Sequence, residues 1–180
     1  MKTIAIVGTF DTKGREFRYV KKLVEDLGCK AFTIHTGVFE PLFEPDVSNR
    51  EVAAAAGYNI DEIAARKDRA LATEALSKGT EILIPQLYAE GKFDGIISCG
   101  GSGGTSLATP AMRALPIGVP KVTTCTTRMP PWCVISSNTE FRKAVDICII
   151  LDFQMCTGHP HTELVAQFLS GQFNTVENSA

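Results

Sequence analysis

Several features that identify particular classes of protein are missing from this sequence. None of its apolar runs approaches the roughly 18 residues of a membrane-spanning helix. The N-terminus, MKTIAIVGTF, lacks both the longer apolar run and the small-residue cleavage site of a signal peptide. We therefore expect a cytoplasmic protein with no membrane partner.

Clustered positive charge is also missing. The 18 lysines and arginines form no block and are outnumbered by 20 acidic residues, so the formal net charge is −2. Because binding to nucleic acid depends on clustered basic residues, nucleic acid is not an expected partner. A content of 44% hydrophobic and 21% charged residues is typical of a soluble globular protein, and 180 residues suit one domain with a substantial core.

Metal-binding and redox motifs are missing as well. The six cysteines form no C-x-x-C pair, and no histidine stands at a zinc-ligand spacing from them. We interpret the cysteines as small buried hydrophobic side chains, and we expect no metal site built by the protein alone. Four of the six lie in the last third of the chain, together with His159 and His161.

What the sequence does contain is a repeated alternation of strand and helix patterns. Continuous apolar runs predict buried strands in TIAIVGT, CKAFTIHTG, FDGIIS and PKVTTC. Helical spacing predicts helices in KGREFRYVKKLVEDLG, which Gly28 ends, and in SLATPAMRAL. Between them we expect a surface excursion with a short alanine-rich helix, and then one helix over most of residues 61–92. That helix has Asp61 as its N-cap and irregularities at Gly79 and Pro85. The alternation predicts an α/β, Rossmann-like three-layer domain with a mostly parallel sheet.

Two motifs follow strands of this predicted sheet. GTFDTKG, from Gly8 to Gly14, follows the first strand, and GGSGGTS, from Gly100 to Ser106, follows the third. In a parallel α/β sheet the ligand crevice lies at the carboxyl ends of the strands. Backbone N–H groups that converge at a helix start, with no Cβ in the way, suit a phosphate group. The glycine-rich motif therefore predicts a phosphate site, although it matches neither the Walker pattern nor the dinucleotide fingerprint.

The polar residues of both motifs have a functional and a structural interpretation. Lys13 suits a phosphate as a point charge, and Asp11 suits a ribose hydroxyl or a magnesium ion held through water. Alternatively, Asp11 and Thr12 cap the following helix, and Lys13 is solvated. In the glycine-rich motif, Thr105 or Ser106 caps the helix, and the glycines allow a tight turn with positive φ.

The two motifs, together with HTGVFEP, DVSNREVAAAAG and LYAEGKFDGIISCGG, resemble the N-terminal ATP-binding domain of the tomato mosaic virus resistance protein-like family. The similarity covers residues 1–121. It implies a domain that binds ATP, with or without Mg²⁺, followed by a second domain in proteins that form homodimers, and it implies no defined reaction. Arg50 of DVSNR would clamp a phosphate, with a surface ion pair as the alternative. The contact residues that the resemblance implies are Gly8, Thr9, Asp11, Thr12, Lys13, Arg50, Gly100, Gly101, Ser102, Gly103, Gly104 and Thr105.

The pattern changes after Lys121. Residues 122–180 contain Cys, Pro, Trp and His in a mixture unlike the preceding part, although AVDICIILDF predicts a buried strand and HTELVAQFLSG a short helix. We interpret this part as a divergent continuation of the same domain, or as a truncated or frame-shifted end that lacks the second domain. We expect it to be partly ordered and to promote self-association.

Three functional interpretations follow. The chain is an ATP-binding module, an enzyme acting on a phosphorylated or carboxylate-bearing small molecule, or an inactive truncated product. In the enzyme, Asp11 or His35 would act as acid or base, although a core position suits His35 better. Turnover of ATP separates the first two interpretations, and cooperative melting tests the third.

Overall fold

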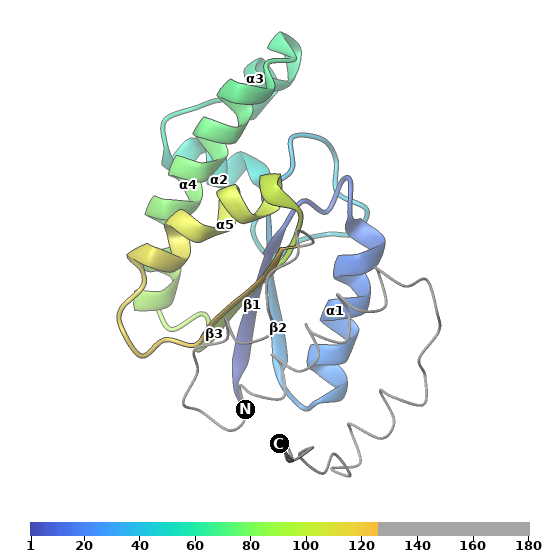
Figure 1. Cartoon of the computed structure of the whole chain (residues 1–180), viewed down its shortest axis with the longest axis vertical. Helices are drawn as coiled ribbons and strands as arrows, with labels where there is room; N and C mark the ends of the chain where they lie inside the picture. Colours follow the sequence, from blue (N-terminus) through green and yellow to red (C-terminus); the bar gives the residue numbers. More distant parts are fainter. Residues whose placement is uncertain (126–180) are drawn as a thin grey trace, which may run out of the picture.

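The computed structural model describes residues 1–125. Within them, strands and helices alternate along the chain (Figure 1). The predictions for AVDICIILDF, HTELVAQFLSG and the rest of residues 126–180 fall outside the described residues. No helix in the described part combines the length and the apolar character needed to cross a membrane.

All four predicted strands are present, and Gly28, with φ of 76°, follows the first helix as expected. The elements are β1 (Thr3–Gly8), α1 (Gly14–Asp26), β2 (Lys30–His35), α2 (Asn49–Ala55), α3 (Ile60–Arg66), α4 (Arg69–Ala89), β3 (Gly95–Gly100), α5 (Ser102–Ala114) and β4 (Lys121–Cys125).

The four strands are parallel and lie in the order β2-β1-β3-β4. β1 occupies a central position, with Val7 opposite Ile34 on one side and opposite Ser98 on the other. The strand order reverses between β1 and β3, because the chain places β2 on one side of β1 and then β3 and β4 on the other side. The predicted α/β, Rossmann-like architecture is confirmed.

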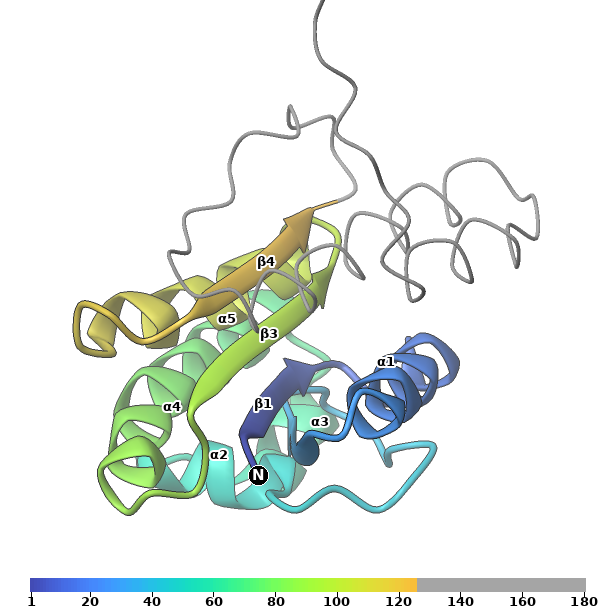
Figure 2. The same ribbon diagram turned by 90° about the horizontal axis from the view of Figure 1, so that it is seen from below.

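Helices cover both faces of the sheet (Figure 2). Alternate residues of β1 belong to two separate cores: Ile4 and Ile6 pack with α1, whereas Ala5 and Val7 pack with α2, α4 and α5. We call these the α1 face and the α5 face. Full burial of one large aliphatic side chain contributes about 1.5–3 kcal/mol, so shifting β1 by one residue would exchange the two sets and is strongly disfavoured.

The segment predicted as one helix forms two, α3 and α4. Lys67 has left-handed backbone geometry, with φ of 51°, and ends α3. The side chain of Asp68 then accepts two backbone N–H groups and starts α4, which continues through Pro85 without a break. The predicted N-cap is also wrong, because Asn59 caps α3 and Asp61 lies in its first turn. Figure 1 shows α3 and the start of α4 projecting beyond the carboxyl ends of the strands.

The glycine-rich motif differs from its expected loop conformation. Gly100 is the last residue of β3, Gly101 is the N-cap of α5, and Gly103 and Gly104 lie in the first turn of that helix, which begins at Ser102. None of these glycines has positive φ. The tight-turn interpretation is therefore wrong, because the chain passes directly from strand to helix.

Candidate functional site

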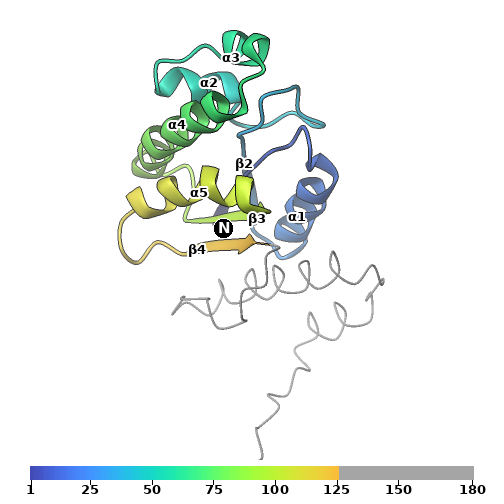
Figure 3. The same cartoon turned by 45° about the horizontal axis from the view of Figure 1, so that its top comes forward.

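Both predicted motifs lie at one edge of the sheet, where the strand order reverses. GTFDTKG connects β1 to α1, and GGSGGTS carries the chain from β3 into α5. Because Val7 and Ser98 pair in the sheet, the two strand ends are neighbours about 4.8 Å apart. Figure 3 shows the starts of α1 and α5 around these strand ends. This is the position at which open α/β sheets bind ligands.

The connection from β1 leaves the start of α1 without a side-chain cap. Lys13 is the N-cap residue, and its side chain forms no capping hydrogen bond. The hydroxyl of Thr12 donates to the hydroxyl oxygen of Thr9 at 3.0 Å, and Asp11 bonds elsewhere. The interpretation of Asp11 and Thr12 as N-caps is therefore wrong. The first backbone N–H groups of α1 have no side-chain acceptor, and a ligand can use them.

Asp11 ties this connection to the segment after β2. One carboxylate oxygen accepts the N–H of Thr12 at 2.7 Å, and the other accepts the N–H of Phe39 at 3.1 Å. A Cβ at Gly37 would come within 2.3 Å of the same carboxylate, so this contact requires glycine. The half-buried Asp11 is thus held in one orientation, whereas the side chain of Phe39 is exposed.

His35 is a structural residue of the core. It is fully buried, and its Nδ1 lies 3.1 Å from the backbone N of Phe10 and 3.3 Å from that of Gly37. Its Nε2 lies 2.9 Å from the carbonyl oxygen of Phe39. Two donors at Nδ1 and an acceptor at Nε2 assign the ring proton to Nε2. Because both nitrogens bond to backbone, this geometry supports the core interpretation over an acid or base role.

The start of α5 is an uncapped and sterically open helix N-terminus. Gly101 has no side chain with which to cap it, and the hydroxyls of Thr105 and Ser106 donate to the carbonyls of Gly101 and Gly103 instead. A Cβ at Gly103 or Gly104 would meet its nearest heavy atom at 3.8 Å, which is ordinary contact. Glycine in a helix costs about 0.5–1 kcal/mol relative to alanine. Among the described residues, no steric contact requires these two glycines, and they leave the backbone of the first turn open to an approaching group.

Gly8, by contrast, is explained by packing. It ends β1, and a Cβ there would lie 1.9 Å from the ring of Phe17 on α1. A Cβ at Gly14, the first residue of α1, would lie 2.5 Å from Leu42. Both glycines of GTFDTKG therefore allow α1 and the segment after β2 to approach the strand end closely.

Arg50 forms a surface ion pair, which was the alternative to its predicted contact with a phosphate. Its guanidinium Nη1 lies 2.5 Å from Oδ2 of Asp61, and both side chains are exposed. The structure thus brings residues 8–13 and 100–105 to one edge of the sheet. Arg50 instead forms an ion pair with Asp61 of α3.

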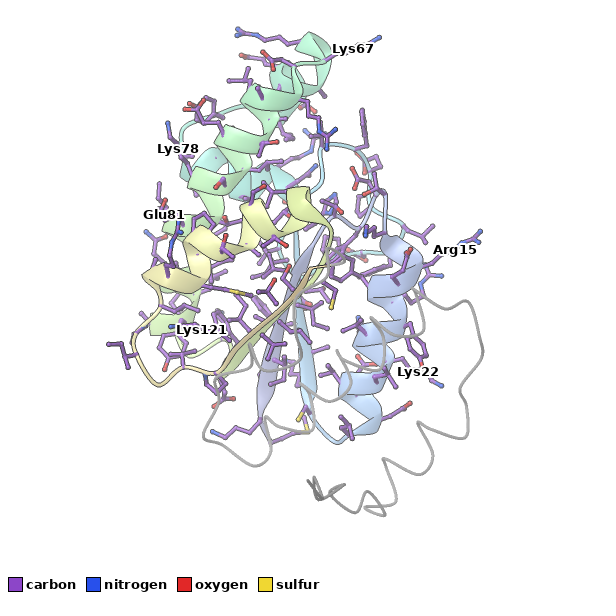
Figure 4. The ribbon with its side chains drawn as sticks, in the orientation of Figure 1. Arg15, Lys22, Lys67, Lys78, Glu81 and Lys121 are labelled. Carbon is purple, nitrogen blue, oxygen red and sulfur yellow. The ribbon has the colours of Figure 1, made fainter. Side chains whose placement is uncertain are left out.

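Arg69 was not identified from the sequence. It is the first residue of α4, and its Nη2 lies 3.8 Å from the position that a Cβ of Gly103 would take. Figure 4 shows Lys67, just before α4, at the projecting tip. Arg69 lies two residues further along the chain, and its side chain approaches the first turn of α5. No local sequence pattern could have identified Arg69, because only the packing of α4 on α5 brings the starts of these two helices together.

The described residues also form an open cavity of about 850 Å³ at the opposite end of the sheet, lined in part by Lys2, Cys29, Tyr88 and Asp94. Its charged residues Lys2 and Asp94 already pair with each other at 2.8 Å. Within residues 1–125, no three His, Cys, Asp or Glu side chains form a group that could hold a metal ion. The uncapped helix starts lie at the carboxyl ends of the strands, and we therefore place the candidate site there.

The family described as "Uncharacterised protein family (UPF0261) N-terminal domain" matches residues 2–132. A UPF0261 protein of Clostridium tetani is 44% identical over 122 residues, which cover 67% of this chain and 30% of the relative. A UPF0261 protein of Rhizobium meliloti is 36% identical over 122 residues, which cover 68% of this chain and 30% of the relative. The ToMV resistance protein Tm-1(GCR237) of Solanum lycopersicum is 40% identical over 83 residues, 44% of this chain and 11% of that protein.

These matches confirm the predicted family relationship, and ATP binding stays a prediction. The chain spans about 30% of the length of the bacterial relatives. The similarity therefore concerns an N-terminal domain of longer proteins.

Proposed function

The chain belongs to the UPF0261 family, and from that premise we propose that it is a nucleotide-binding domain that holds ATP at the carboxyl ends of β1 and β3. The start of α5 carries the proposal. There, Gly103 and Gly104 leave space that no described contact or φ angle explains, beside uncapped N–H groups. Such N–H groups, together with the positive end of the helix dipole, bind phosphate.

The neighbouring connection from β1 supplies the remaining contacts in this proposal. Lys13 adds a positive charge at the uncapped start of α1, where it suits a second phosphate. Thr9 accepts the hydroxyl proton of Thr12, so its own hydroxyl proton is free to donate to a phosphate oxygen. Ser102 and Thr105 contribute backbone N–H groups of the first turn of α5.

Mg²⁺ would bind with the nucleotide and not before it. Magnesium at nucleotide sites is usually held by one or two carboxylates together with phosphate oxygens and water. Asp11 is the carboxylate of the β1–α1 connection, and each of its oxygens already accepts one backbone N–H group. In this proposal it meets the ion through water once the phosphates are present.

A binding module suits this geometry better than an enzyme. Both ring nitrogens of His35 bond to backbone, and Asp11 is held by two N–H groups, so neither side chain is a free general base. In this proposal the domain binds the nucleotide but does not convert it. Any activity that depends on the bound nucleotide would require the rest of the longer protein and its assembly into homodimers.

The proposal is tested by measuring ATP binding to the 180-residue chain. At a hundredfold excess of ATP over its dissociation constant, native-state stability should rise by about 2.7 kcal/mol, which raises the melting temperature. Calorimetric titration should give a micromolar or lower dissociation constant, and ATP should remain unhydrolysed over hours. A melting temperature that does not respond to millimolar ATP contradicts the proposal.

A further inference from the structure

Two buried hydroxyl groups near the candidate site have no described hydrogen-bond partner. Thr36 is 1% exposed and Ser98 is 2% exposed, and neither hydroxyl forms a hydrogen bond within residues 1–125. Other buried hydroxyls do have partners, since that of Thr33 donates to Asp46 and that of Thr80 donates to backbone carbonyls. Buried polar groups are nearly always satisfied, so a missing partner calls for a ligand or an ordered water.

Both hydroxyls belong to the α5 face of the sheet. Ile34 of β2 and Ile96 of β3 lie in the core on that face, and strand alternation places Thr36 and Ser98, each two residues later, on the same side. The N–H of Thr36 still bonds to β1, so the alternation continues past the end of β2. By register, Thr36 is level with Gly100, where the chain turns into α5.

A positive charge lies beside the first turn of α5. The guanidinium of Arg69 approaches Gly103 and forms no ion pair or hydrogen bond with the described residues. A cation beside the positive end of a helix dipole is unfavourable, unless an anion between them interacts with both. The unpartnered hydroxyls, the uncapped N–H groups and the cation are therefore all donors without an acceptor.

We propose that Thr36, Ser98 and Arg69 complete an oxyanion site with the first turn of α5. Its ligand is a phosphate group of the nucleotide's polyphosphate chain, so this inference rests on the proposed function. The guanidinium can bond two phosphate oxygens at once, and the hydroxyls and N–H groups bond the others. The polyphosphate then lies on the α5 face of the strand ends, and Lys13 meets it from the side of α1.

Calorimetric titration of the 180-residue chain with ATP, and separately with inorganic tripolyphosphate, tests the role of Arg69. Arg69→Ala should weaken both ligands by about tenfold or more, as expected for loss of a charge-assisted contact. Arg69→Lys should weaken them less, because it keeps the charge but loses the planar fork. Arg66→Ala is the matched control, since Arg66 is an exposed arginine of α3 that belongs to neither motif, and it should bind as the wild type does.

Thr36→Val and Ser98→Ala test the hydroxyl groups. Each change removes a hydroxyl that has no partner in the free protein, so the melting temperature without ligand should stay the same or rise. Binding of ATP and of tripolyphosphate should weaken several-fold in each variant. A lower melting temperature combined with unchanged binding would mean that the hydroxyl has a structural partner, and it would overturn this assignment.

The outcomes separate this inference from the proposed function. If the wild type binds ATP and Arg69→Ala binds it equally well, the inference fails and the proposed function stands. If the wild type binds tripolyphosphate but not ATP, and Arg69→Ala loses that binding, the oxyanion site stands and the nucleotide assignment fails. If the wild type binds neither ligand, both fail.

Discussion

At the residue scale, glycines near the candidate site have two different purposes. Gly8 and Gly37 are required by the protein's own packing, because a Cβ would collide with the ring of Phe17 or with the carboxylate of Asp11. Gly104 has ordinary helical surroundings and no such neighbour. The same substitution to alanine should therefore have opposite effects on stability at Gly8 and Gly104.

Gly104→Ala should raise the free energy of unfolding by up to about 1 kcal/mol, because alanine is the better helix former. It should also weaken ATP binding, because the added Cβ occupies the space beside the N–H groups of α5. Gly8→Ala is the comparison, and its collision with Phe17 should lower the free energy of unfolding by about 1–3 kcal/mol. Urea unfolding and calorimetric titration measure the two quantities. Wild-type ATP affinity in Gly104→Ala would show that the open space is not used by a ligand.

At the element scale, α4 is long, contains a glycine and a proline, and crosses α2. Gly79 was predicted as an irregularity of the helix, but α4 is continuous there. Gly79 instead allows α4 and α2 to approach each other closely, since a Cβ at this position would lie 1.9 Å from the carbonyl oxygen of Val52 on α2. The approach of α4 to α2 is therefore limited by the backbone carbonyl of Val52, which cannot rotate away as a side chain can.

Gly79→Ala should lower the free energy of unfolding by about 1–3 kcal/mol, because α4 must move away from α2 to admit the methyl group. The gain in helix propensity, about 1 kcal/mol, opposes this loss and does not cancel it. Urea unfolding of Gly79→Ala beside Gly104→Ala checks the contrast, since both place alanine in a helix. A stabilised Gly79→Ala variant would contradict the close packing of α2 and α4.

The elements themselves could largely be predicted, because local patterns determine them. Continuous apolar runs located all four strands, and Gly28 marked the end of the first helix. The break between α3 and α4 could not be predicted, because it depends on Lys67 taking an unusual left-handed conformation. Local patterns placed both motifs of the candidate site at the same edge of the sheet. They did not reveal Arg69 or the partners of His35, which come together only through tertiary packing.

At the scale of the whole molecule, the two ends of the sheet differ in how their polar groups are satisfied. At the amino end, the carboxylate of Asp94 accepts hydrogen bonds from Nζ of Lys2 and from the N–H of Thr3, both at 2.8 Å. These bonds lower the pKa of Asp94, with the Lys2 side chain as the largest cause. At the carboxyl end, the starts of α1 and α5 have no side-chain caps.

Asp94→Asn should reduce stability in a way that depends on pH. Because folding lowers the pKa of Asp94, its contribution is fully present above its unfolded value of 3.8 and is lost as the pH falls through the lower folded value. The exposed pair contributes about 1 kcal/mol or less, so the difference at neutral pH is small. Chemical unfolding between pH 7 and pH 2 should show the difference shrinking only at the acid end. A difference that grows in acid would contradict the assignment.

Hydrogen exchange with and without ATP should show which end of the sheet binds the ligand. Without ATP, the amides of β1 should exchange slowest, because β1 is bonded to strands on both sides and buried on both faces. With ATP, protection should increase in residues 8–14 and 100–106, because the phosphates would occupy the N–H groups at the two helix starts. Residues 88–95 and 118–120, which line much of the 850 Å³ cavity at the amino end, should not change. The cavity is sizeable, but its charged side chains Lys2 and Asp94 already pair, whereas the N–H groups at the two helix starts have no side-chain acceptor. If protection increased around the cavity and not at the helix starts, size would have outweighed unsatisfied donors, and the candidate site would lie at the wrong end of the sheet.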